Sequence, residues 1–198
     1  MTTESSATDG DTTARAALEQ AESWLTPERD GNRAAPVRGL PSTAAIVGHP
    51  IHPMMIPYPI AFLTAVLATD VASRATRDPF WSRASHLLLG AGIVAGAAAG
   101  AVGAIDYLTI RRAREKPAGK LHAYGNPIAL ALAGANLALR RNRRDGATPT
   151  GGEIALSAAT AVLLGVTGWA GAELSYRHMV GVEGHGDQHT EEEKRVVS

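Results

Sequence analysis

Four long runs of residues with almost no charged side chain limit what this chain can fold into more than any other feature. They cover approximately residues 54–72, 87–107, 122–139 and 154–174. An α-helix needs about 20 apolar residues to cross the hydrocarbon core of a bilayer, and each run is close to that length. Helices in the core of a soluble bundle would show polar faces at helical spacing, and these runs show almost none. The runs therefore predict an all-α protein whose helices span a membrane.

The composition of the whole chain conceals this pattern. A hydrophobic fraction of 45% and a mean hydropathy of -0.04 are typical of a soluble domain, because the polar residues gather near the two termini. The chain has 19 basic and 19 acidic residues, so a nucleic-acid partner is not indicated. It has no cysteine, which excludes disulfides, thiolate metal ligands and cysteine nucleophiles.

The runs divide the chain into a polar N-terminal tail (residues 1–46), a membrane domain (47–182) and a charged C-terminal tail (183–198). The tails have little apolar surface to bury, so we expect them to be disordered or partly helical. Apolar residues recur at helical spacing over 14–25 and predict an amphipathic helix, with a solvated, frayed helix as the alternative. The N-terminal sequence is not that of a secretory signal. His185 and His189 fall in the C-terminal tail, where nothing rigid would hold two metal ligands together.

Short, basic connections join the four runs, and short connections make consecutive helices antiparallel neighbours. The expected architecture is an up-down four-helix transmembrane bundle. The second run places Gly92, Gly96 and Gly100 on one stripe, where missing side chains let a neighbouring helix approach closely. Besides the lipid bilayer, we expect a redox partner or a second copy of the chain as partner, the latter through this stripe.

Antiparallel helices bring the polar residues at alternate ends of the runs to one membrane face. His49 and His52 precede the first run, Asp106 ends the second, and His122 opens the third. Glu173 and His178 close the fourth run. Ionisable groups at the apolar layer usually face one another rather than lipid. We therefore predict one site built from these six residues. At the opposite face Asp70 and His86 have arginines nearby to pair with or to solvate them.

Two chemistries would use such a site. Three or four imidazoles with a carboxylate suit Zn²⁺ or another divalent metal. Two imidazoles from opposite sides of a bundle can instead bind a haem iron axially. Against haem, His49 and His52 lie at the membrane surface, and there is no second tier of histidines for a two-haem arrangement. As a further alternative, the histidines cap backbone groups and the tyrosines form an interfacial belt. No nucleotide-binding or hydrolase motif is present.

The motifs resemble those of a family of uncharacterised bacterial four-helix membrane proteins, classed as a domain of unknown function of the 2231 type. The resemblance covers about residues 47–182 and rests on four stretches: GHPIHP from Gly48, Gly103 with Asp106 and Tyr107, LHA from Leu121, and GWAGAELSYRHMVGV from Gly168. Some members of that family carry a fused Rieske iron–sulfur domain, which implies electron transfer. This chain departs from those members because it has no cysteine.

We therefore expect a multi-pass protein of the plasma (inner) membrane whose polar cluster binds haem or a divalent metal, as part of an electron-transfer system. The alternative is a non-catalytic scaffold with structural histidines. A small transporter is less favoured, because no charge lies in the middle of any run. A polar N-terminal segment without a signal would be hard to export, so we expect both termini in the cytoplasm.

Overall fold

The computed structural model describes residues 39–182. The predicted amphipathic helix at 14–25, most of the N-terminal tail, and His185 and His189 lie outside the described residues. The elements are β1 (Ala45–Ile46), β2 (His49–Pro50), α2 (Ile51–Met55), α3 (Pro57–Thr76), α4 (Pro79–Thr109), α5 (Arg111–Glu115), α6 (Pro117–Arg140) and α7 (Gly151–Tyr176).

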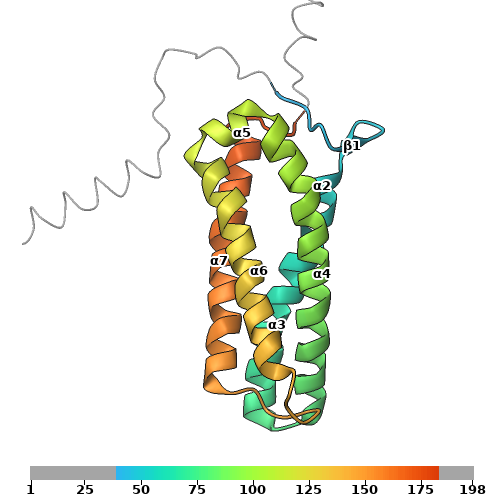
Figure 1. The fold of residues 1–198 in the computed structure, drawn as a ribbon, viewed down its shortest axis with the longest axis vertical. Helices are drawn as coiled ribbons and strands as arrows, with labels where there is room; N and C mark the ends of the chain where they lie inside the picture. The colour runs from blue at the N-terminus through green and yellow to red at the C-terminus, as the bar shows by residue number, and fades with distance from the viewer. Residues whose placement is uncertain (1–38, 183–198) are drawn as a thin grey trace, which may run out of the picture. The chain divides into compact units, whose positions relative to one another are not determined.

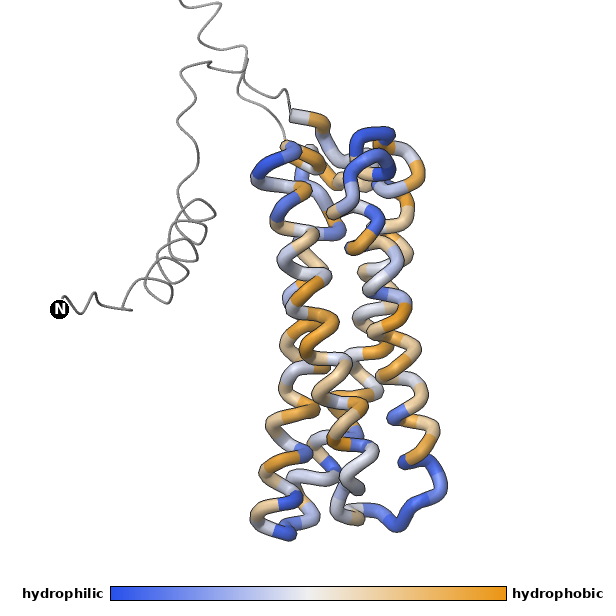
Figure 2. Tube along the Cα trace, turned by 90° about the vertical axis from the view of Figure 1, so that its left-hand side faces the viewer, coloured by the Kyte–Doolittle hydropathy of each residue, from blue (hydrophilic) through white to orange (hydrophobic). Residues whose placement is uncertain are grey.

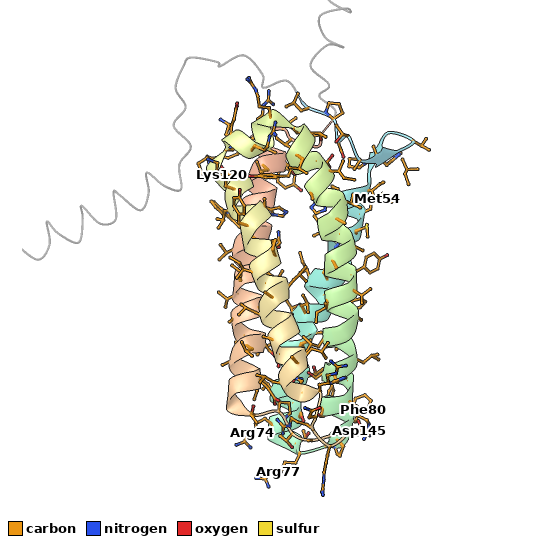
Figure 3. The ribbon with its side chains drawn as sticks, in the orientation of Figure 1. Met54, Arg74, Arg77, Phe80, Lys120 and Asp145 are labelled. Atoms are coloured by element: carbon orange, nitrogen blue, oxygen red, sulfur yellow. The ribbon has the colours of Figure 1, made fainter. Side chains whose placement is uncertain are left out.

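Four long helices, α3, α4, α6 and α7, lie side by side (Figure 1). Each contacts two neighbours: α3 packs on α4 and α7, and α6 packs on α4 and α7. Hydrophobic residues occupy the middle of the helices, and hydrophilic residues gather at both ends (Figure 2). We call the end with α2, α5 and His122 the histidine end. The opposite end, where Figure 3 labels Arg74, Arg77 and Asp145, is the arginine end.

Three segments in the described part are long and apolar enough to cross a membrane: Ile51–Thr76, Pro79–Thr109 and Gly151–Tyr176. The predicted run at 122–139 is helical and lies in α6, but α6 is not among them. Polar residues such as Lys120, Asn126 and Asn136 make it less apolar than the other three helices. The structure therefore gives three candidate spans where the sequence analysis expected four.

Local sequence signals determine where the long helices begin. Proline stands at the first position of α3, α4 and α6, where its missing N–H has no intrahelical partner to lose. Asp78 caps α4 by accepting a hydrogen bond from the backbone N–H of Phe80 at 2.8 Å. Thr150 and Glu153 form a reciprocal capping box at the start of α7. These signals mark the starts of α4 and α7 at the arginine end and of α3 and α6 at the histidine end.

The glycine stripe of α4 is used for packing inside the chain. A Cβ atom added to Gly92 would lie 2.6 Å from Leu63 of α3, and one added to Gly96 would lie 2.6 Å from Leu130 of α6. Gly100 is exposed, and no atom lies within 4 Å of its added Cβ. Two of the three glycines predicted to contact a partner are thus already engaged, and a partner contact at Gly100 stays a prediction.

Candidate cofactor site

His52 and His122 approach each other at the histidine end. His52 lies in α2 and His122 near the start of α6, with their ring centroids 5.9 Å apart and their planes at 89°. Both residues are partly buried. Residues far apart in the sequence therefore bring two imidazoles into the same small region between the helices.

Each of these rings is held by a backbone carbonyl. The Nδ1 atom of His52 lies 2.8 Å from the carbonyl oxygen of Ala99 in α4, and Nδ1 of His122 lies 2.8 Å from that of Thr167 in α7. A carbonyl only accepts hydrogen bonds, so Nδ1 must carry the proton. In the neutral imidazole this leaves the lone pair on Nε2, which is the arrangement found in metal-ligating histidines.

A glycine makes room for each imidazole. A Cβ atom added to Gly103 would lie 2.6 Å from Cε1 of His52, and one added to Gly171 would lie 2.9 Å from Cε1 of His122. Each glycine follows the residue whose carbonyl holds the ring, Ala99 or Thr167, by four positions, or about one helical turn. One face of α4 and one face of α7 therefore offer the same combination of carbonyl and space.

The two imidazoles also share their sequence separation with other residue pairs. His52 and His122 are 70 positions apart, and so are Pro57 and Pro127. Asp70 and Arg140, at the arginine end, have the same separation. The sequence analysis missed this spacing, although the pattern of His, Pro and a charged residue was visible in it.

The other predicted site residues have different partners. His49 is exposed in β2, with its Nδ1 2.9 Å from the carbonyl oxygen of Val47. Glu173 pairs with Arg177 at 2.9 Å. The backbone carbonyl of His178 accepts a hydrogen bond from Arg112 at 3.1 Å. The contacts of His49 and Glu173 are local to their own segments, and that of His178 joins it to Arg112 in α5, so these three residues do not gather around one point.

Asp106 holds the segment that precedes β1. Its carboxylate accepts hydrogen bonds from the Ser42 hydroxyl at 2.7 Å and from the backbone N–H groups of Thr43 and Ala44 at 2.9 and 3.1 Å. Leu40 also forms a bridge with Val180, so the segment before β1 contacts the segment after α7. Between residues 39 and 182, no group of three or more histidine and carboxylate side chains is placed to hold a metal ion. Of the six predicted residues, the structure brings together only His52 and His122.

A second polar cluster, which the sequence analysis reduced to Asp70 with a nearby arginine, fills the core at the arginine end. Arg140 donates two parallel hydrogen bonds to Asp70, from Nη1 to Oδ1 at 3.0 Å and from Nη2 to Oδ2 at 2.7 Å. The Ser157 hydroxyl donates to Asp70 at 2.6 Å, and the Ser85 hydroxyl donates to it as well. The amide oxygen of Asn136 accepts from Nε of Arg140 at 2.9 Å.

This network joins all four long helices and leaves nothing in it unpaired. Asp70 is 0% exposed and Arg140 8%, and no buried side-chain nitrogen or oxygen in the described residues lacks a hydrogen-bond partner. Removing one member of such a buried pair typically costs about 3–5 kcal/mol, because the other charge is left uncompensated. The cluster therefore links the four helices. Its polar groups are paired with one another and are not available to a ligand.

Comparison with known proteins gives one match. The sequence model of a family described as "Predicted membrane protein (DUF2231)" matches residues 48–184. Neither a curated protein nor a solved structure matches the chain.

Proposed function

The chain belongs to the DUF2231 family of predicted membrane proteins, and from the geometry of its histidine pair we propose that it is a membrane haem protein in which His52 and His122 would hold one iron. Its role is to carry single electrons within or across the membrane. The observation that supports this is the pair itself: two imidazoles from opposite halves of the chain, each oriented through Nδ1, with ring centroids 5.9 Å apart.

The number of ligands favours haem over zinc. A structural zinc site takes four protein ligands and a catalytic one three, whereas haem iron needs at most two axial ligands from the protein. The described residues offer two imidazoles and no third histidine or carboxylate placed to complete a metal site. Because the chain has no cysteine, the haem would be held without covalent attachment.

The separation of the rings fits an iron between them. A metal–imidazole bond is about 2.0 Å long, so two imidazoles on opposite sides of one metal have their ring centres about 6 Å apart. The 5.9 Å observed is close to this value. Gly103 and Gly171 let the two rings lie directly against the backbones of α4 and α7, because a Cβ atom at either position would come within 3 Å of a ring.

The surrounding backbone would tune such a ligand pair. The hydrogen bond from each Nδ1–H to a carbonyl fixes the ring orientation and makes Nε2 more basic. The haem, when bound, supplies the one-electron chemistry, and the chain supplies the two nitrogens and their orientation. Burial and hydrogen bonding around the ligands are the features by which a protein sets a haem potential.

We further propose that α6 is a fourth span, so that the four long helices form an up-down transmembrane bundle in the plasma membrane. At 24 residues the helix is about 36 Å long, which is enough to cross the hydrocarbon core. Its most costly group, Arg140, is neutralised by Asp70. With an even number of spans both termini lie on one side, which we assign to the cytoplasm.

The competing function is a membrane scaffold with structural histidines. The hydrogen bonds to Ala99 and Thr167 are consistent with it, because they fasten α2 to α4 and α6 to α7 without any cofactor. A visible absorption spectrum of the full chain, purified in mild detergent from haem-sufficient cells, separates the two. The haem proposal requires a Soret band, and the scaffold has none.

A further inference from the structure

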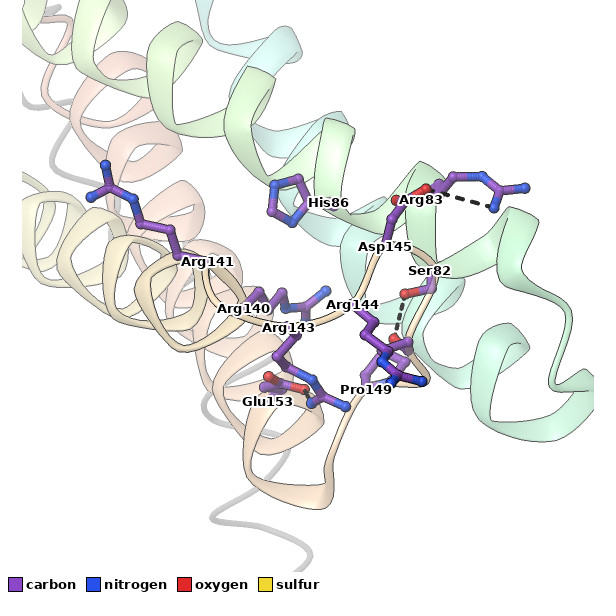
Figure 4. A pocket seen from close by; sticks show the side chains of 12 residues that line it. Ser82, Arg83, His86, Arg140, Arg141, Arg143, Arg144, Asp145, Pro149 and Glu153 are labelled. Carbon is purple, nitrogen blue, oxygen red and sulfur yellow. Dashed lines mark hydrogen bonds and ion pairs between the residues drawn. The ribbon is translucent and has the colours of Figure 1, made fainter.

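A basic cavity of about 210 Å³ opens at the arginine end, between the start of α4 and the connection from α6 to α7. Five arginines line it against two carboxylates, Asp145 and Glu153. The arginines are Arg83, Arg140, Arg141, Arg143 and Arg144. Figure 4 shows His86 of α4 in the same cavity, between Arg141 and Arg83. The cavity therefore has an excess of positive charge.

Only part of this charge is neutralised within the described residues. Arg140 is committed to Asp70, and Arg143 forms an ion pair with Glu153. Arg83 reaches Asp145 only at 4.0 Å, with both side chains largely exposed, so that pair contributes little. Arg141 and Arg144 are exposed, and neither forms an ion pair with another described residue. These two guanidinium groups are open to an external anion.

An apolar groove adjoins the basic cavity. It has a volume of about 580 Å³ and runs along α4 beside Leu137 of α6. The α4 residues that line it are Leu87, Gly90, Ala91, Val94 and Ala95. His86 lines both the groove and the basic cavity. Because α4 begins at the arginine end, the groove runs from the cavity toward the apolar middle of the bundle.

We propose that these two adjoining features form a binding site for an anionic phospholipid. The phosphate would pair with Arg141 and Arg144, since guanidinium groups bind phosphate oxygens through paired, charge-assisted hydrogen bonds. One acyl chain would lie in the groove along α4. A free phosphate would use the cavity alone, and the apolar groove beside it favours the lipid. The site is independent of His52 and His122, which lie at the other end of the bundle.

The headgroup part of the site is tested by native mass spectrometry of the full chain in mild detergent with added dioleoylphosphatidylglycerol. We expect one tightly bound lipid per chain, and at least tenfold weaker binding in the Arg141→Gln/Arg144→Gln double variant. The matched control is Arg74→Gln/Arg77→Gln, which removes two exposed arginines from the same end but outside the cavity (Figure 3). It should change binding less than twofold. Equal losses in both double variants, or no discrete bound lipid, would overturn the site.

The groove is tested separately, because it distinguishes a lipid from a free anion. No atom lies within 4 Å of a Cβ added to Gly90, so Gly90→Leu should fold normally and fill the groove. We expect this variant to bind phosphatidylglycerol at least fivefold more weakly, with Gly165→Leu, an equally open glycine of α7, as its control. Inorganic phosphate should compete poorly for the wild-type site. If phosphate displaces the lipid at millimolar concentration and Gly90→Leu binds normally, the site is one for free phosphate and the lipid proposal is wrong.

Discussion

Asp70 and Arg140 form a buried, bidentate ion pair at the arginine end of the bundle. They are 70 positions apart in the sequence, as are His52 and His122, whose rings approach each other at the histidine end. The first and second halves of the chain are therefore in contact at both ends of the bundle. The Asp70–Arg140 ion pair fixes the helices relative to one another at the arginine end. The contact between His52 and His122 brings the proposed ligands together at the histidine end.

The ion pair should control stability. Asp70→Asn or Arg140→Gln alone leaves a buried charge without a partner, so we expect each to lower the free energy of unfolding by about 3–5 kcal/mol. The double variant removes both charges and should be less damaging than either single change. Thermal unfolding in detergent, followed by circular dichroism, measures this. Arg74→Gln, which removes an exposed arginine from the same end of the bundle (Figure 3), serves as the control. Additive losses in the double variant would show that the two residues do not act as a pair.

The glycines beside the imidazoles should determine ligand geometry. Gly103→Ala or Gly171→Ala places a methyl group within 3 Å of a histidine ring, so the ring must shift. We expect the haem content of either variant to fall severalfold while the helical circular dichroism signal is retained. Gly168→Ala in α7, where the added atom meets nothing within 4 Å, should keep wild-type haem content. Normal haem content in both ring-side variants would argue against the proposed coordination.

The number of spans can be read from two reporter fusions. If α6 crosses the membrane, Ser198 lies on the cytoplasmic side and Ala147 on the other. Alkaline phosphatase, which is active only outside the cytoplasm, should then be active at Ala147 and inactive at Ser198. A bundle with only three spans would reverse both results, because α6 would stay on the cytoplasmic side and α7 would carry the C-terminus out.

Most of the helical organisation could be predicted from the sequence, because long uncharged runs and prolines at helix starts are local signals. The number of spans was harder to predict, because Asn126 and Asn136 lower the hydropathy of α6, and their hydrogen-bond partners cannot be recognised from the sequence of α6 alone. Asn136 accepts a hydrogen bond from Arg140 and donates one to Ser157 in α7, so it belongs to the buried polar cluster. Such a polar residue can be interpreted only once its partners on other helices are known.

The candidate site was predictable only in part. The antiparallel order of the helices predicts that His52 and His122 lie at the same end of the bundle. It does not predict in which direction each helix points its side chains. The helix order also does not predict that Asp106 accepts hydrogen bonds from the Ser42–Ala44 segment, or that Glu173 forms an ion pair with Arg177. The spacing of 70 residues would have separated His52 and His122 from the other candidates, because only these two histidines share it with Pro57 and Pro127.

The proposal of a haem between His52 and His122 is tested most directly by the haem content of three alanine variants. Wild-type protein, purified in mild detergent from cells supplied with haem precursor, should show a Soret band and about one haem per chain. His52→Ala and His122→Ala should each lose most of it, whereas His49→Ala, which changes an exposed ring, should not. A folded wild-type protein without a Soret band, or full haem content in both His52→Ala and His122→Ala, would contradict the account.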